Sequence, residues 1–171
     1  MGSLTQLEVL LPELRAYARS LVANPDSAED LVQDAIERTL RAAERPAALS
    51  ELRPWLFRVI RNLHYDELRK WRVRREYIAA EIRHYSAVGP VSDHARDVLL
   101  RLAYERLPPE KREVLFLVDI MGLRYAEAAE VMGVAQGTVM SRISRARRAL
   151  RAQLETETEN DGGGQAATRQ E

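Results

Sequence analysis

Cysteine is absent from this chain of 171 residues, which excludes disulfide frameworks, thiolate zinc sites and cysteine nucleophiles. No apolar run approaches the roughly 20 residues that a membrane-spanning helix needs. The N-terminus also lacks the basic and then apolar pattern of a secretory signal. These absences predict a cytoplasmic protein with no direct membrane insertion.

Signatures of catalysis are missing as well. His64, His84 and His94 do not have the i, i+4 spacing of helical metal ligands. The chain contains no glycine-rich phosphate loop and no serine in a nucleophile context. We therefore expect no catalytic residues, no metal and no cofactor, and an enzyme is the least favoured class.

Net charge is the third thing that the chain lacks, because 26 Lys and Arg are balanced by 26 Asp and Glu. A neutral total argues against a nucleic-acid-binding protein, yet the charges are unevenly placed. Segment 53–75 holds eight basic and two acidic residues, and segment 142–151 holds five Arg and no acid. Segment 26–44 holds six acids against two Arg. This polarity predicts at least two kinds of partner surface.

Arginine provides almost all of the positive charge, since lysine occurs only at positions 70 and 111. Its planar fork suits phosphates and base edges. A GC-rich bacterial genome would produce the same bias, and we rank that explanation first.

Strand signals are absent, and most of the chain repeats apolar residues at helical spacing. A first helix carries Leu4, Leu7, Leu11 and Leu14. A second is predicted to begin with Ser27 as N-cap and to end at Arg45-Pro46. A third runs from about Pro54 to about Arg75, with a loop or short turn at 46–53 before it.

The periodicity weakens over 76–92, which contains Val88-Gly89-Pro90 and is predicted to be a flexible linker. Helical patterns return over 93–154. The segment 155–171 has no apolar periodicity and is expected to be a disordered acidic tail. The sequence thus predicts an all-α fold of two small helical domains, 1–75 and 93–154, which the linker joins.

Residues 124–154 have the pattern of a helix-turn-helix. Gly133 suits the left-handed conformation at the end of the first helix, and Ala128 and Ala129 allow the second helix to approach closely. In DNA-binding proteins of this shape, the second helix enters the major groove and contacts base edges. Its polar or flanking positions are Gln136, Thr138, Met140, Ser141, Arg142, Ser144, Arg145 and Arg148. The alternative is a three-helix core with a solvated basic helix.

The third helix interleaves its basic residues with four aromatic ones: Trp55, Phe57, Tyr65 and Trp71. This mixture favours single-stranded nucleic acid, because bases stack on rings while cations follow the phosphates. Asn62, Asp66 and Arg69 share one helix face. Alternatively, Trp55 belongs to the core and Asp66–Arg69 is a surface ion pair of little energetic weight.

Three segments and their order resemble the extracytoplasmic-function (ECF, group IV) sigma-70-type RNA polymerase sigma factors. SAEDLVQDAIERTL (27–40) and RPWLFRVIRNLHYDELRK (53–70) are similar to sigma region 2. LPPEKREVLFLVDIMGLRYAEAAEVMGVAQGTVMSRISRARRALR (107–151) is similar to region 4. The resemblance covers roughly residues 4–154 and includes no region 1.1 or region 3 domain.

The resemblance implies a role for each segment. The second helix, which lies in the acidic segment 26–44, would bind the clamp helices of the largest polymerase subunit. The core-polymerase-binding residues of this acidic helix would be Asp30, Gln33, Asp34 and Glu37. Region 4 would contact the polymerase flap. The third helix and the loop 44–52 would open and read the −10 element, with Asn62 lining a pocket for a flipped base. The −10 residues would be Arg58, Arg61, Asn62, Asp66 and Arg69.

Helix 136–151 would read the −35 element, with Ser141 and Arg145 as the best candidates among the eight positions named above. Met140 and Ser144 depart from the residue types usual in the family, so the −35 sequence is not implied. An anti-sigma protein is the further partner that the family implies. We expect an alternative sigma factor that binds core RNA polymerase and promoter DNA and nucleates melting. An autonomous helix-turn-helix regulator, the alternative, leaves the acidic helix unexplained.

Overall fold

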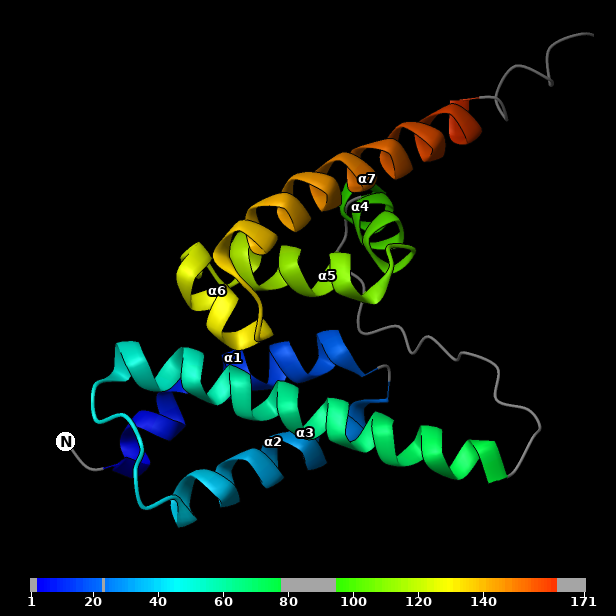
Figure 1. The fold of residues 1–171 in the computed structure, drawn as a ribbon. Helices are drawn as coiled ribbons and strands as arrows, with labels where there is room; N and C mark the ends of the chain where they lie inside the picture. Colours follow the sequence, from blue (N-terminus) through cyan, green and yellow to red (C-terminus); the bar gives the residue numbers. More distant parts are fainter. Residues whose placement is uncertain (1–2, 23, 78–94, 163–171) are drawn as a thin grey trace, which may run out of the picture.

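The structure, a computed structural model, describes residues 3–22, 24–77 and 95–162 (Figure 1). Within these ranges it is all-helical and contains no strand, so the predicted fold class is confirmed. The N-terminal module consists of α1 (Ser3–Leu21), α2 (Pro25–Arg41) and α3 (Leu49–Tyr77). The C-terminal module consists of α4 (Ala95–Glu105), α5 (Pro109–Leu115), the π-helical turn η1 (Phe116–Ile120), α6 (Tyr125–Met132) and α7 (Gln136–Gly162).

The start of α2 differs from the prediction that Ser27 caps it. Asn24 is the N-cap, and its side-chain oxygen accepts hydrogen bonds from the backbone N–H of Asp26 (2.8 Å) and of Ser27 (3.3 Å). Pro25 then occupies the first helical position, where its missing N–H costs nothing. The helix ends at Arg41, before the predicted stop at Arg45-Pro46.

Helix α3 also begins earlier than predicted, because Leu49 and not Pro54 is its first residue. Backbone N–H groups of Glu51 and Leu52 bond to the Ala48 carbonyl and form the first turn. Pro54 forfeits only the bond to the carbonyl of Ser50. Because Ser50 is exposed, solvent can satisfy that carbonyl, and the helix tolerates the proline.

Helix α7 packs against α4, α5 and α6 and is the central helix of the C-terminal module. It continues past Leu154 to Gly162, into the segment 155–171 that was expected to be disordered. Residues 155–159 alternate Glu with Thr and contain no Gly or Pro to stop a helix. The rest of that tail and the predicted linker from residue 78 onward lie outside the described residues.

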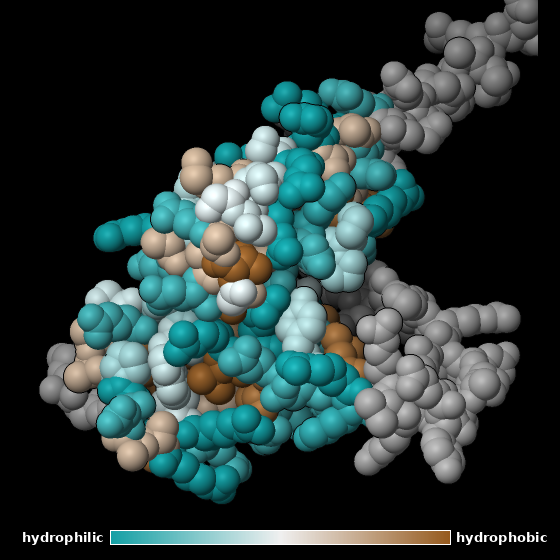
Figure 2. All heavy atoms as spheres, in the orientation of Figure 1, coloured by the Kyte–Doolittle hydropathy of each residue, from teal (hydrophilic) through white to brown (hydrophobic). Residues whose placement is uncertain are grey.

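The two modules contact each other directly, which the sequence did not indicate. α3 packs on α6, and α1 packs on α5 and η1, so that the C-terminal helices lie on α1 and α3 (Figure 1). Tyr17 links both cores, with ring centroids 5.0 Å from Phe57 and 5.9 Å from Phe116. The buried apolar residues of both modules, apart from Ala103, therefore form one continuous cluster. The outer surface in the same orientation is largely hydrophilic, with only small apolar clusters (Figure 2).

Candidate nucleic-acid interface

The acidic surface is the outer face of α2. It is defined by Asp30, Gln33, Asp34 and Glu37, all of which are exposed. Steps of three and four residues align these side chains. The opposite face buries Leu31, Val32 and Ala35 against α1 and α3, which fixes the direction in which the acids point.

Five predicted −10 residues lie on α3, but they do not share one surface. Arg58, Asn62 and Arg69 are exposed. Arg69 Nη2 forms an ion pair with Asp66 Oδ1 at 2.9 Å, which is the surface pair that the alternative interpretation anticipated. Arg61 instead points toward the C-terminal module.

The aromatic residues of α3 also divide between core and surface. Phe57 is fully buried, and Trp55 is partly buried against the core. Trp71 is 53% exposed and therefore accessible to a stacking partner. Tyr65 is half-buried, and the Arg61 guanidinium lies 4.4 Å from its ring centroid. A surface groove lined by Trp55, Arg58 and residues of α6 runs between the modules.

The helix-turn-helix has the geometry that its sequence predicted. Gly133 adopts φ 64° and ψ 38°, the left-handed conformation, and ends α6. Val139, Ile143 and Ala146 of α7 are buried. The side chains of the opposite face are exposed: Gln136, Met140, Ser141, Ser144, Arg145 and Arg148. Thr138 and Arg142 flank this face and are half-buried.

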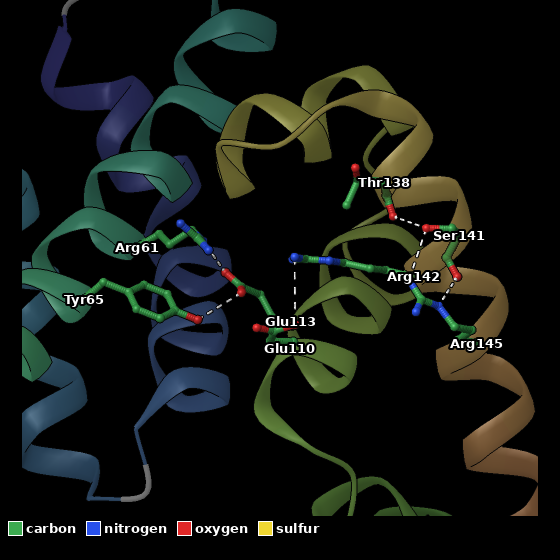
Figure 3. A network of polar contacts seen from close by, with 8 residues as sticks. All are labelled: Arg61, Tyr65, Glu110, Glu113, Thr138, Ser141, Arg142 and Arg145. Atoms are coloured by element: carbon green, nitrogen blue, oxygen red, sulfur yellow. Dashed lines mark hydrogen bonds and ion pairs between the residues drawn. The ribbon is translucent and has the colours of Figure 1, made fainter.

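Local hydrogen bonds orient the exposed side chains of α7 (Figure 3). Arg145 donates from Nε to the Ser141 carbonyl (3.2 Å) and from Nη2 to Ser141 Oγ (3.3 Å). The Ser141 hydroxyl in turn donates to the Thr138 carbonyl (3.0 Å). These hydrogen bonds place the Arg145 guanidinium beside the Ser141 hydroxyl, so the two best −35 candidates lie together.

Other arginines of α7 are bound to acids of the same module. Arg147 donates to both carboxylate oxygens of Asp119 on η1, at 3.1 and 2.6 Å, and this bond raises the pKa of the guanidinium. Arg142 Nη2 lies 3.8 Å from Glu110 Oε2 on α5. These contacts tie the basic helix to α5 and η1 and reduce the number of cations that face outward.

Glu113 on α5 is the polar residue that the sequence analysis missed. Only 3% of it is exposed, and it accepts three hydrogen bonds from the N-terminal module, of which those from Arg61 and Tyr65 are drawn in Figure 3. The donors are Arg61 Nε at 2.7 Å, Tyr17 Oη at 3.0 Å and Tyr65 Oη at 3.3 Å. The available signal was a single acid beside the apolar run Val114–Val118.

Burial and the Glu113 carboxylate both alter titration in this network. Burial raises the pKa of the Tyr17 hydroxyl well above its ordinary value, and the neighbouring carboxylate raises it further. The pKa of Tyr65 is raised by the same causes. Both tyrosines therefore keep the protons that they donate to Glu113. Burial lowers the pKa of His64 on the same helix.

No group of three or more His, Cys, Asp or Glu side chains that could hold a metal ion occurs in the part of the chain that the structure describes. Of the three histidines, His84 and His94 lie outside it. None of the described helices is both long and apolar enough to cross a membrane.

Comparisons with known proteins identify the two modules. Residues 7–75 match the family model for sigma-70 region 2, and residues 97–150 match the model for sigma-70 region 4. The ECF RNA polymerase sigma factor EcfG of Rhodopseudomonas palustris is 37% identical over 156 residues, which cover 90% of this chain and 85% of that protein. The chain belongs to the ECF RNA polymerase sigma factors.

Other ECF sigma factors extend the likeness. SigC of Mycobacterium tuberculosis is 35% identical over 133 residues, which cover 75% of this chain and 71% of that protein. The sigma factor RpoE of Bartonella quintana, solved with the anti-sigma factor NepR, superposes with a TM-score of 0.77. It is 32% identical, and the match covers 88% of this chain and 95% of RpoE.

Family membership confirms the main functional prediction and not the alternative of an autonomous regulator. This ECF sigma factor acts in transcription initiation with RNA polymerase and promoter DNA. Its relatives are sigma factors, which are not catalytic enzymes.

Proposed function

We propose that three exposed helix faces of this ECF sigma factor divide the work of initiation. The acidic surface of α2 binds core polymerase, α3 reads the melted −10 strand, and α7 reads the −35 duplex. The observation that supports this division best is that α7 buries its apolar face while Ser141 and Arg145 remain exposed and hydrogen-bonded to each other. A serine and an arginine placed in this way suit base edges in a major groove.

On α3, the exposed Asn62 and Arg58 suit a strand that has already left the duplex. An amide can bond the edge of an unstacked base, and an arginine can bind phosphate or stack on a ring. Unstacking costs a few kcal/mol, which contacts to the open strand must offset. Melting in this proposal is driven by binding alone, with no nucleotide hydrolysis and no catalytic residue.

We also propose a cytoplasmic location and an anti-sigma partner. RpoE of Bartonella quintana was solved with the anti-sigma factor NepR. CnrH, which is 25% identical to this chain and superposes with a TM-score of 0.59, was solved with the cytosolic domain of CnrY. The match to CnrH covers 91% of this chain and 90% of the CnrH chain. Likeness to RpoE, which was solved with an anti-sigma factor, and to CnrH, which was solved with a domain of another protein, supports a similar partner here.

Replacing Arg145 by Ala tests the −35 assignment. Loss of a base-contacting arginine should weaken binding of the holoenzyme to a −35-containing promoter by about 1–3 kcal/mol. The measurement is run-off transcription and filter binding with core polymerase on the promoter of the chain's own gene. Arg19→Ala, the same change at an exposed position of α1, is the control. Equal promoter affinity of Arg145→Ala and wild type would contradict the assignment.

Replacing Asp34 by Arg tests the acidic surface. We expect affinity for core polymerase to fall because a reversed charge repels a complementary surface. Glu8→Arg makes the same change of charge on an exposed position of α1 and should bind normally. Both variants should retain wild-type helicity, and affinity is read by fluorescence titration with core enzyme. If the two variants bind core polymerase equally well, α2 does not provide the docking surface.

A further inference from the structure

The contact between the two modules places a polar network inside an apolar interface. Around it lie the tilted ring contacts of Tyr17 with Phe57 and Phe116 and the packing of α3 on α6. A second polar contact crosses nearby, where Arg53 Nη2 donates to the Met121 carbonyl at 2.6 Å. The interface is therefore a closed arrangement of the modules that both packing and hydrogen bonds define.

Glu113 is the centre of that network. It lies on α5, and all three of its hydrogen-bond donors belong to α1 or α3. Its side chain is 2% exposed in this arrangement, so these three donors, and not water, satisfy its charge while the modules are together. The Arg61 guanidinium is held from two sides, by this carboxylate and by the Tyr65 ring 4.4 Å away.

A carboxylate and a DNA phosphate present the same chemistry to arginine, namely anionic oxygens that accept charge-assisted hydrogen bonds. Arg61 is one of the residues proposed to contact the −10 strand, and this inference rests on that proposal. In the closed arrangement Glu113 occupies the Nε donor of Arg61 and the hydroxyl of Tyr65. The contact is selective, since Ser141 and Arg145 of α7 remain exposed.

We propose that Glu113 is an intramolecular latch that imitates a DNA phosphate. It holds the two modules closed and withholds Arg61 and Tyr65 from −10 DNA until the carboxylate is withdrawn. The −35 surface of α7 stays accessible throughout. The closed chain is thus able to meet duplex DNA before it is able to capture a melted strand.

The latch is tested with Glu113→Gln, which keeps the size of the side chain and removes its charge. Glu8→Gln, the same substitution on the exposed face of α1, is the control. The chain contains no Cys, so Arg38→Cys on α2 and Arg151→Cys on α7 allow specific attachment of two spin labels. Double electron–electron resonance on the full chain then measures the separation of the modules. We expect a predominant short distance in wild type and Glu8→Gln, and a large population at a second, longer distance in Glu113→Gln.

DNA binding by the same proteins is measured with two fluorescent probes from the promoter of the chain's own gene. One is the single non-template strand across the −10 element, and the other is the −35 duplex. A closed state that holds about 90% of the molecules lowers apparent single-strand affinity about tenfold. Glu113→Gln should recover that factor on the single strand and leave duplex affinity unchanged.

Three outcomes would overturn the latch: a single short distance in Glu113→Gln, an open chain with unchanged single-strand affinity, or an equal gain on both probes. The double variant Arg61→Ala with Glu113→Gln distinguishes failure of the latch from failure of the proposed −10 contact of Arg61. If the open chain binds the single strand equally with and without Arg61, the −10 assignment of Arg61 is wrong. Should Glu113→Gln fail to fold, Tyr65→Phe removes one bond of the latch but keeps the ring, and a partial shift toward the longer distance is expected.

Discussion

Replacing Arg61 by Leu is expected to destabilise the protein more than replacing Glu113 by Leu, although the two side chains form one ion pair. Arg61 Nε and Glu113 Oε1 are 2.7 Å apart, and the exposed fractions of the two side chains are 18% and 2%. The partner that is left behind therefore differs in its access to water. That access decides the cost, because an unpaired charge is destabilising in proportion to its desolvation.

The magnitudes follow from what each substitution leaves unpaired. Arg61→Leu leaves a carboxylate at 2% exposure with only two tyrosine hydroxyls, so we expect about 3–5 kcal/mol, as for one partner removed from a buried pair. Glu113→Leu leaves a guanidinium that can turn toward solvent. Its main cost is the buried Tyr17 hydroxyl, which loses its acceptor, and we expect about 2–3 kcal/mol.

Urea unfolding followed by circular dichroism, on both single variants and the double variant, measures these values. The double variant removes both charges and should cost less than the sum, with a coupling energy of about 1–3 kcal/mol. The loss of unfolding free energy in each variant cannot exceed the free energy needed to separate the modules, because Glu113 is hydrated once they part. The distance between the modules is therefore measured for each variant as well. Two results would refute the reasoning. One is an equal loss of stability in Glu113→Leu and Arg61→Leu while the modules remain together. The other is a loss in the double variant that equals the sum of the two single losses.

Two further predictions concern the C-terminal module. Gly133→Ala should cost about 1 kcal/mol in urea unfolding, because φ is 64° and nothing lies within 4 Å of an added Cβ, so only backbone strain acts. Gly137→Ala, at the second residue of α7 and equally uncrowded, should instead stabilise by about 0.5–1 kcal/mol; a loss at both positions would contradict this account. Burial raises the pKa of Tyr104 to about 12. The stability that it provides is complete below about pH 10, where unfolded tyrosine ionises, and is lost as the pH rises to about 12. Tyr104→Phe should remove about 2–3 kcal/mol of this alkaline loss in unfolding measured at pH 9 and pH 12, and an unchanged loss would show that Tyr104 is not its source.

The features that sequence reasoning predicted well are those that a few neighbouring residues determine. Apolar spacing placed the buried faces of the helices, and the glycine at position 133 placed the turn of the helix-turn-helix with its left-handed backbone. Both signals are local, since steric limits on φ and the period of the helix act over four residues or fewer. The start of α2 was missed because Asn24 and Ser27 are both good caps, and Pro25 decides between them.

The closed arrangement could not be predicted in this way. Tyr17 and Glu113 are 96 positions apart, and neither has a local pattern that names the other. Periodicity assigns Glu113 to the buried face of α5, but no residue near it in the sequence indicates a partner for a buried acid. Only the packing of α5 against α1 and α3 provides the donors that make a buried carboxylate tolerable.

The balance of 26 basic and 26 acidic residues now has a partly internal explanation. Arg61, Arg142 and Arg147 face acids of the C-terminal module, so DNA can gain these cations only by exchange for a carboxylate. Such an exchange is close to neutral, whereas an exposed arginine that meets a phosphate releases counterions and adds affinity. Net attraction to DNA must then come mainly from exposed arginines such as Arg58, Arg145 and Arg148. All three internal acids cost affinity, but only Glu113 pairs with an arginine of the other module, so it alone makes the capture of DNA depend on how the two modules are arranged.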